Sequence, residues 1–279
     1  MSRASRRTVT HSVSTDLAGE LDATHPVNGI ITLLGIFDAH FPLHDPHVIG
    51  GAMAWARAHK PDVILYGGDA FDNEACSSHG GNSSPPKLYE EAAPLRRHLK
   101  TMRRENPHAK LIYMDGNHED RTHRKIINEA PALDGAVDMA QIMGLDAVGA
   151  VHVPYGASHR LGSLVTKHAD YQGAAVARQH FDKFCTHVGE SVMHGHTHRA
   201  QTWIHGRSDG THFGAYSMPC ACKLGASYMK GRESNWVQGW AVAYINTITR
   251  AINVYPVLCW QGTAMWNGKE YGKAAGHHA

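Results

Sequence analysis

Hydrophobic positions form short continuous runs separated by segments of helical periodicity in the first part of the chain. The run from Ile30 to Phe37 is rich in β-branched residues and too continuous for a half-exposed strand, so we expect a strand buried on both faces. Asp45-Pro46 provides an N-cap and a first-turn proline, and Lys60-Pro61 ends the helix that follows. The other elements expected here are strands at 63–66 and 111–114, helices at 46–59 and 87–105, and a loop at 75–86. This β-α-β-α-β order predicts a parallel sheet with right-handed crossovers.

The second part of the chain is less regular. Its patterns predict strands at 163–166 and 191–193, a helix at 173–187, and antiparallel strands from about residue 200, the strongest at 235–248 and 251–259. Residues 1–28 are polar and without periodicity, which predicts a flexible N-terminal arm. We therefore expect residues 29–279 to form a single α/β domain whose part 200–279 is antiparallel.

Composition narrows the class of protein. The chain has 27 Lys and Arg against 25 Asp and Glu, and this near balance argues against a tail-driven nucleic-acid binder. Its longest apolar run is far shorter than the roughly 20 residues that span a bilayer, so no membrane association is expected. Arg6-Arg7 resembles a twin-arginine signal, but no apolar segment follows it. Five cysteines are too few and odd in number for a disulfide scaffold, which indicates a reducing, cytoplasmic compartment.

Carboxylate, amide and imidazole groups directly follow each buried strand. In open α/β sheets, sites lie outside the carboxyl ends of the strands, so we expect these side chains to converge. In an extended chain, the Asp-x-His and His-x-His pairs would each present two side chains on one face. The groups, in chain order, are Asp38 with His40, Asp69, Asn117 with His118, His168, and His196 with His198.

This donor set predicts a metal centre. Mixed carboxylate, imidazole and amide ligands suit manganese, iron or zinc better than an all-oxygen calcium site or a thiolate zinc site. There are more donors than one ion ordinarily needs, so we expect two divalent metal ions, manganese first and iron or zinc as alternatives. Asp69 is the natural bridging ligand.

The order of these motifs resembles the calcineurin-like metallophosphoesterase superfamily, which includes Mre11-type nucleases and phage-encoded members. The motifs are Asp38-x-His40, Gly68-Asp69, Gly116-Asn117-His118-Glu119, His168 and Gly195-His196-x-His198, and they span residues 38–198. The resemblance implies a two-sheet α/β sandwich with flanking helices. It also implies that Asp38, His40 and His198 hold one ion, that Asn117, His168 and His196 hold the other, and that Asp69 bridges them. His118 would be catalytic. The family has a glycine after the equivalent of His168, where this chain has Ala169-Asp170.

Several side chains near these motifs allow two interpretations. Arg121 either contacts a substrate phosphate or is a solvated residue at a helix start. His194 shares the parity of His196, but the family pattern favours a packed residue. Cys220-Ala221-Cys222 is too isolated for a zinc site and is interpreted as buried thiols. Arg96, Lys100, Arg103 and Arg104 fall on one face of the helix 87–105, and either follow a nucleic-acid backbone or form a solvated surface.

These observations favour a dinuclear metal-dependent phosphoesterase. The first hypothesis is a phosphodiesterase or nuclease acting on nucleotides or nucleic acid. Its support is the basic helix face and an aromatic and basic segment between Tyr228 and Trp240, which alternatively forms a strand-like cap. The second hypothesis is a phosphomonoesterase for a phosphoprotein or small metabolite. The third is a non-catalytic metal-binding scaffold, although such relatives usually lose ligands that this chain keeps. The expected partner is a phosphate ester, nucleic acid included; the sequence leaves the native metals and the oligomeric state open.

Overall fold

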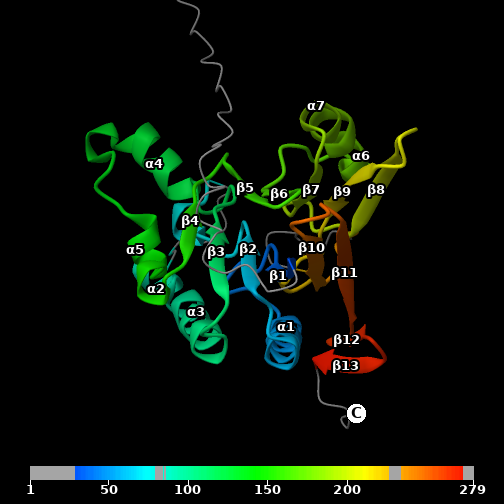
Figure 1. The fold of residues 1–279 in the computed structure, drawn as a ribbon. Helices are drawn as coiled ribbons and strands as arrows, with labels where there is room; N and C mark the ends of the chain where they lie inside the picture. The colour runs from blue at the N-terminus through cyan, green and yellow to red at the C-terminus, as the bar shows by residue number, and fades with distance from the viewer. Residues whose placement is uncertain (1–28, 79–83, 85, 226–233, 273–279) are drawn as a thin grey trace, which may run out of the picture.

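The computed structural model of the chain describes residues 29–78, 84, 86–225 and 234–272, so the expected N-terminal arm at 1–28 lies outside the described residues. Two β-sheets pack face to face, and helices cover their outer sides (Figure 1). The fold class expected from the sequence, an α/β sandwich of two sheets with flanking helices, is confirmed.

The first sheet has eight strands, and the half that ends at the edge strand β4 is parallel. Its parallel strands lie in the order of the chain: β1 (Ile30–Ile36), β2 (Val63–Gly67), β3 (Lys110–Met114) and β4 (Val151–Val153). The predicted strands at 30–37, 63–66 and 111–114 are confirmed. The sequence analysis missed β4, a strand of three residues that is too short to show a period.

The C-terminal strands extend the same sheet on the other side of β1. They are β10 (Gly239–Asn246), β11 (Ile252–Trp260), β12 (Thr263–Trp266) and β13 (Lys269–Gly272), and each pairs antiparallel with its neighbour. The antiparallel character predicted for this part is therefore confirmed. The predicted strand at 235–248 is shorter, because pairing with β1 begins at Ala241 and ends at Asn246.

The second sheet has five strands in the order β5-β6-β7-β9-β8. Their bounds are β5 (Ser158–Leu161), β6 (Leu164–Lys167), β7 (Ser191–His194), β8 (Gln201–Gly206) and β9 (His212–Ser217). The expectation that all strands after about residue 200 are antiparallel is wrong for β9, which pairs parallel with β7. The chain first runs out along β8 at the sheet edge, and β9 returns between β8 and β7.

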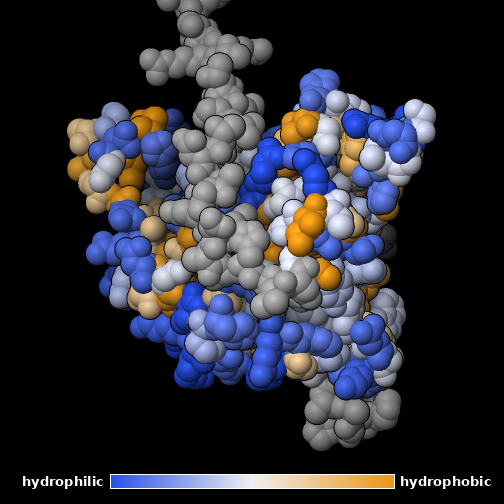
Figure 2. All heavy atoms as spheres, viewed as in Figure 1, coloured by the Kyte–Doolittle hydropathy of each residue, from blue (hydrophilic) through white to orange (hydrophobic). Residues whose placement is uncertain are grey.

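Helices cover both outer faces. On the eight-stranded sheet lie α1 (Pro46–His59), α2 (Leu88–Glu91), α3 (Ala93–Glu105) and α5 (Met139–Met143), whereas α4 (Arg121–Glu129) projects away from the sheet beyond β4 (Figure 1). Short turns lie at Glu74–Cys76, Pro131–Leu133 and Asp146–Val148. On the five-stranded sheet lie α6 (Val176–His180), the π-helical turn Phe181–Cys185 and α7 (Thr186–Val188), which follow one another without a break. The helix predicted at 173–187 is therefore present, beginning at Val176 and with a π-helical turn in its middle. The Asp45 side chain caps α1 as predicted, by accepting the N–H of His47 at 2.9 Å. The outward surface of α1 and α3 is hydrophilic (Figure 2).

Alternate residues of β1 contribute to two separate hydrophobic layers. Leu34 packs with Trp55 of α1 in the layer between the eight-stranded sheet and its helices. Leu33 packs with Met193 of β7 in the layer between the two sheets. Burial on both faces explains why this strand is a continuous apolar run rather than an alternating one.

Candidate metal centre

The predicted site residues lie on loops that follow the carboxyl ends of strands from both sheets. Asp38 and His40 follow β1, Asp69 follows β2, Asn117 and His118 follow β3, His168 follows β6, and His196 and His198 follow β7. The two sheets place these loops together: the backbone N–H of His196 donates to both carboxylate oxygens of Asp38, each at 2.9 Å. The expected convergence is therefore present.

The local backbone differs from the extended chain that the sequence analysis assumed. Asp38, His40, Asp69, His196 and His198 all have positive φ angles, between 48° and 81°. The left-handed conformation is unfavourable for residues other than glycine, and such residues concentrate at functional sites. Both residues of each pair therefore lie in tight turns instead of an extended strand. His198 contacts His40, whereas His196 belongs to the group around Asp69.

Three side chains form the first donor group. His40 Nε2 lies 3.2 Å from His198 Nε2, and His198 Nε2 lies 3.5 Å from Asp38 Oδ1. All three residues are nearly inaccessible to solvent. Burial would raise the pKa of Asp38, but the neighbouring His198 and His168 outweigh it and hold that pKa below its ordinary value.

The second donor group surrounds Asp69. His168 Nε2 lies 3.3 Å from Asp69 Oδ2 and 3.1 Å from Asn117 Oδ1. Ligand atoms of Asp69, His168 and His196 all lie within 4.8 Å of one another. A carboxylate oxygen of Asp69 is also within 4.8 Å of a ligand nitrogen of His40, so the carboxylate lies between the two groups. This is the position that a bridging ligand requires.

The donor set fits two divalent cations. Burial lowers the pKa of His168, yet Asp69 raises it to about 9, so a buried proton balances the carboxylate charge in the absence of metal. A cation would replace such protons. His196 Nδ1 is buried without a hydrogen-bond partner among the described residues, while its Nε2 contacts Gln172 at 2.7 Å. An unpartnered imidazole nitrogen beside Asp69 is a free ligand atom.

His118 lies beside Asp69 and is held by its backbone and one ring nitrogen. Its backbone N–H donates to Asp69 Oδ1 at 2.9 Å. Its Nδ1 lies 2.8 Å from the carbonyl oxygen and 3.1 Å from the carboxylate Oδ1 of Asp72. Burial lowers the pKa of His118, but Asp69 and Asp72 outweigh it and raise that pKa.

Arg121 lies against His118 instead of extending into solvent. Its Nη2 is 2.9 Å from His118 Nε2, and its Nη1 donates to the carbonyl oxygen of Asp72 at 2.8 Å. Of the two interpretations from the sequence, this contact favours a residue at the site, since a guanidinium beside the candidate catalytic imidazole can reach a phosphate bound there.

Two further carboxylates hold the site residues in place: Asp72, which no sequence motif indicates, and Glu119, which belongs to a recognised motif but had no role assigned from the sequence. Asp72 Oδ1 accepts from the Nδ1 atoms of His40 and His118, both at 3.1 Å. Glu119 accepts the Tyr113 hydroxyl at 2.8 Å and the backbone N–H of Asp69 at 3.1 Å. Burial and the nearby Asp69 raise the pKa of Glu119 to about 7. Glu119 ends a recognised motif, whereas only the turn after Asp69 could have pointed to Asp72.

Packing also decides between the alternatives left open for His194 and for the basic face of α3. His194 is fully buried and stacks on His180 with the ring centroids 3.9 Å apart, so it packs as predicted. The basic face of α3 is neither a continuous track for nucleic acid nor merely solvated. Arg96 donates to the carbonyl of Ile142 at 2.7 Å, and Arg103 donates to the carbonyl of Val148 at 2.7 Å. These two arginines hold the segments around α5 against α3.

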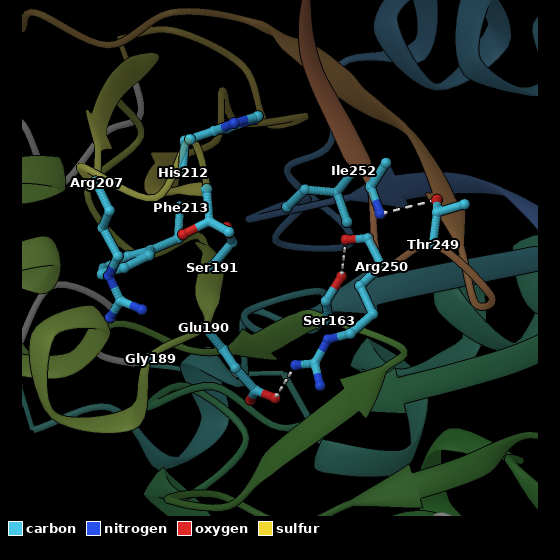
Figure 3. Close-up of a pocket in the computed structure, with 13 residues that line it drawn as sticks. Ser163, Gly189, Glu190, Ser191, Arg207, His212, Phe213, Thr249, Arg250 and Ile252 are labelled. Atoms are coloured by element: carbon cyan, nitrogen blue, oxygen red, sulfur yellow. Dashed lines mark hydrogen bonds and ion pairs between the residues drawn. The ribbon is translucent and has the colours of Figure 1, made fainter.

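A cavity of about 490 Å³ lies at the opposite end of β7, before Ser191. None of the candidate site residues lines it, because they follow the other end of the strand. Its carboxylate, Glu190, is paired with Arg250 at 3.4 Å (Figure 3). The lining has this one carboxylate against two arginines, Arg207 and Arg250, so the cavity has no equivalent of the carboxylate and imidazole groups described above.

Comparison with known proteins returns matches in solved structures only. No family model matches the chain, and no curated protein matches it. The chain is similar to Vacuolar Protein Sorting 29 from Cryptosporidium parvum, with 11% identity and a TM-score of 0.44, over 88% of this chain and 99% of that one. It is also similar to the nuclease MPE of Pseudomonas putida, with 12% identity and a TM-score of 0.35, over 80% and 87% of the chains. A third neighbour is YfcE, a phosphoesterase from E. coli, with 14% identity and a TM-score of 0.34, over 81% and 98%.

The likeness concerns the fold alone. At 11 to 14% identity and TM-scores of 0.34 to 0.44, it carries no conclusion about activity, substrate or partners. No helix in the described part of the chain has the length and apolar character needed to cross a membrane.

Proposed function

We propose that the chain is a dinuclear metal-dependent phosphoesterase that hydrolyses phosphodiesters of nucleotides or nucleic acid. The observation that carries this proposal is the position of Asp69, whose carboxylate lies between two groups of buried ligand atoms. The donors fit manganese first, and iron or zinc as alternatives. One ion would bind Asp38, His40 and His198, the other would bind Asn117, His168 and His196, and Asp69 would bind both. Two such ions would activate a water molecule and polarise the phosphoryl group.

His118 is the catalytic acid in this proposal. Asp72 holds its Nδ1, which leaves Nε2 as the atom able to give a proton to the leaving-group oxygen. Asp69 and Asp72 raise the pKa of His118, which favours a proton on Nε2 once the Arg121 guanidinium no longer donates to that atom. In the free protein the Arg121 guanidinium donates to His118 Nε2. In the complex with substrate, the guanidinium would contact a phosphoryl oxygen instead.

The preference for nucleotides or nucleic acid rests on Trp236, since the basic face of α3 no longer supports it. The half-buried Trp236 ring meets His198 edge-on, with the ring centroids 4.1 Å apart. An aromatic surface directly beside a phosphoryl-binding site suits stacking with a nucleobase. The expected aromatic and basic segment from Tyr228 to Trp240 lies partly outside the described residues. A reducing, cytoplasmic compartment remains part of the proposal on the number of cysteines alone.

The proposal is tested with dialysed protein and manganese, zinc or no added metal. The substrates are p-nitrophenyl phosphate, bis-p-nitrophenyl phosphate, and single- and double-stranded DNA. We expect metal-dependent cleavage of the diester well above that of the monoester, and no turnover by Asp69→Asn. His108→Asn, which changes an exposed histidine away from the site, should behave as the wild type.

Monoester cleavage without diester or DNA cleavage would replace the proposal by a phosphomonoesterase. Inactivity on every substrate with two metals bound would indicate the non-catalytic scaffold. Retention of full activity by Asp69→Asn would contradict the dinuclear site itself.

A further inference from the structure

Two of the candidate ligand histidines have a hydrogen-bond acceptor behind the ring. His40 directs Nε2 into the site, and its Nδ1 meets Asp72 Oδ1 at 3.1 Å. His168 directs Nε2 toward Asp69, and its Nδ1 meets the carbonyl oxygen of Gly67 at 3.4 Å. Such partners fix the tautomer of a ligand histidine, because they hold the proton on the nitrogen that does not bind the metal.

His198 also directs Nε2 into the site, and the atom behind its ring is a thiol sulfur. Cys222 Sγ lies 4.0 Å from His198 Nδ1, whereas Asp38 and His40 face Nε2. A neutral imidazole that binds a cation through Nε2 must carry its proton on Nδ1. His198 is only 5% exposed, so an unsatisfied N–H there would be costly. Cys222 Sγ is the one acceptor that meets this nitrogen in the part of the chain that the structure describes.

Backbone hydrogen bonds hold the cysteine segment between the loops that carry the ligands. The N–H of Ala221 donates to the carbonyl of Phe37, next to Asp38, at 2.9 Å. The N–H of Cys220 donates to the carbonyl of Val237 at 2.9 Å, and the N–H of Val237 donates to the carbonyl of His198 at 2.8 Å. Cys222 itself is 3% exposed. Its sulfur is therefore held in place relative to the imidazole.

We propose that Cys222 is a positioning residue for His198, with its sulfur accepting a hydrogen bond from Nδ1–H so that the proton stays on Nδ1 and Nε2 stays free for a cation. This inference rests on the proposed metal-dependent function. In this arrangement Cys222 Sγ meets Nδ1 of His198, whereas Asp38 and His40 meet Nε2. The sulfur also lies within 4.8 Å of a ligand nitrogen of His40, so direct ligation is the alternative that the test must separate. From the sequence, Cys220 and Cys222 were expected only to be buried thiols. The proposal gives Cys222 a function at the site.

Cobalt(II) titration of the metal-free protein tests the inference without any measurement of activity. The variants are Cys222→Ala, Cys222→Ser and, as a matched control, Cys185→Ala, which removes a buried thiol in another hydrophobic cluster. We expect Cys222→Ala to weaken cobalt binding at one of two sites by about 10–100-fold. Cys222→Ser should keep most of the affinity, since a hydroxyl oxygen also accepts a hydrogen bond from Nδ1–H. Cys185→Ala should bind as the wild type, and thermal unfolding of all variants checks that each is folded.

The cobalt spectrum separates positioning from direct ligation. We expect no sulfur-to-cobalt charge-transfer band in the wild type. A band that disappears in Cys222→Ala would overturn the inference in favour of a thiolate ligand. Unchanged affinity in Cys222→Ala, or equal losses in the alanine and serine variants, would overturn it as well. Binding of fewer than two ions by the wild type would instead contradict the proposed dinuclear function.

Discussion

Asp38 accepts the backbone N–H of His196 on both carboxylate oxygens, each at 2.9 Å, although the two residues lie 158 positions apart in the chain. Asp38 follows a strand of the eight-stranded sheet, and His196 follows a strand of the five-stranded sheet. This contact is where the two halves of the candidate metal centre are joined.

Gly195 leaves no room for a side chain at this junction. A Cβ on Gly195 would lie 2.5 Å from Asp38 Oδ2 and 3.0 Å from the ring of Phe37. We expect Gly195→Ala to displace the carboxylate, to lower the free energy of unfolding by about 1–3 kcal/mol, and to weaken metal binding. Urea unfolding of the metal-free protein and calorimetric titration with manganese or zinc measure both effects. Gly50→Ala is the control, since a Cβ there meets nothing within 4 Å in α1. Equal behaviour of the two variants would contradict the prediction.

His118→Asn should separate chemistry from metal binding. His118 contacts Asp69 through its backbone and keeps its ring for the substrate, so the substitution should leave two metals bound. Turnover should fall by about 10²–10⁴-fold, the usual effect of removing a general acid. Metal content by mass spectrometry and kcat on the preferred substrate test both parts, with His108→Asn as the control. Unchanged turnover, or loss of a metal, would rule out the assigned role.

Arg121→Ala should impair substrate use without affecting metal content. A charge-assisted hydrogen bond contributes about 1.5–3 kcal/mol, so kcat/KM should fall by about 10–100-fold. Lys125→Ala is the control on the same helix, because Lys125 pairs only with Glu129 at the surface in the described structure. If both variants keep wild-type kcat/KM, Arg121 has no part in binding the phosphate.

Arg103→Ala should reduce stability rather than nucleic-acid binding. The Arg103 guanidinium donates to the carbonyls of Val148 and Ala109, both at 2.7 Å, and both acceptors would lose a partner. We expect a loss of about 1–3 kcal/mol in the free energy of unfolding and an unchanged KM for DNA. The neighbouring Lys100 is exposed, and Lys100→Ala should change stability by less than about 0.5 kcal/mol. A higher KM for DNA with unchanged stability of Arg103→Ala would restore the nucleic-acid interpretation of this face.

Buried neutral histidines should make the metal-free protein acid-sensitive. Burial lowers the pKa of His98 to about 3, and its Nε2 contacts the Tyr66 hydroxyl at 2.9 Å. Because the unfolded chain binds a proton near pH 6.5 and the folded chain does not, stability is lost as pH falls from about 6.5 toward 3. At pH 5 this histidine should cost about 2 kcal/mol relative to neutral pH.

Urea unfolding from pH 7 to pH 5 in a chelator measures this loss free of metal binding. His98→Asn should show a correspondingly shallower pH dependence. The same slope in the variant and the wild type would show that His98 titrates normally in the folded state.

Local pattern was enough to predict the central elements and the candidate ligands. A continuous apolar run such as Ile30 to Phe37 indicates a strand that is buried on both faces. This can be recognised locally, because the pattern is complete within a few neighbouring residues. The same holds for Asp69 and Asn117, which directly follow strands that are recognisable on their own. Elements with few residues, such as β4, carry too little pattern to be recognised.

The tertiary structure decided how those residues meet. Only the packing of the two sheets brings Asp38 to His196, and only the path of the chain after β9 brings Cys222 behind His198. The partners of Arg103 were equally hidden, because the carbonyls that it binds belong to segments without a regular period. The sequence by itself determined which side chains end the strands, since periodicity is a property of neighbouring residues. Which of these side chains hydrogen-bond to one another, or lie close enough to bind the same ion, depends on contacts between distant segments. These contacts form only when the two sheets pack together.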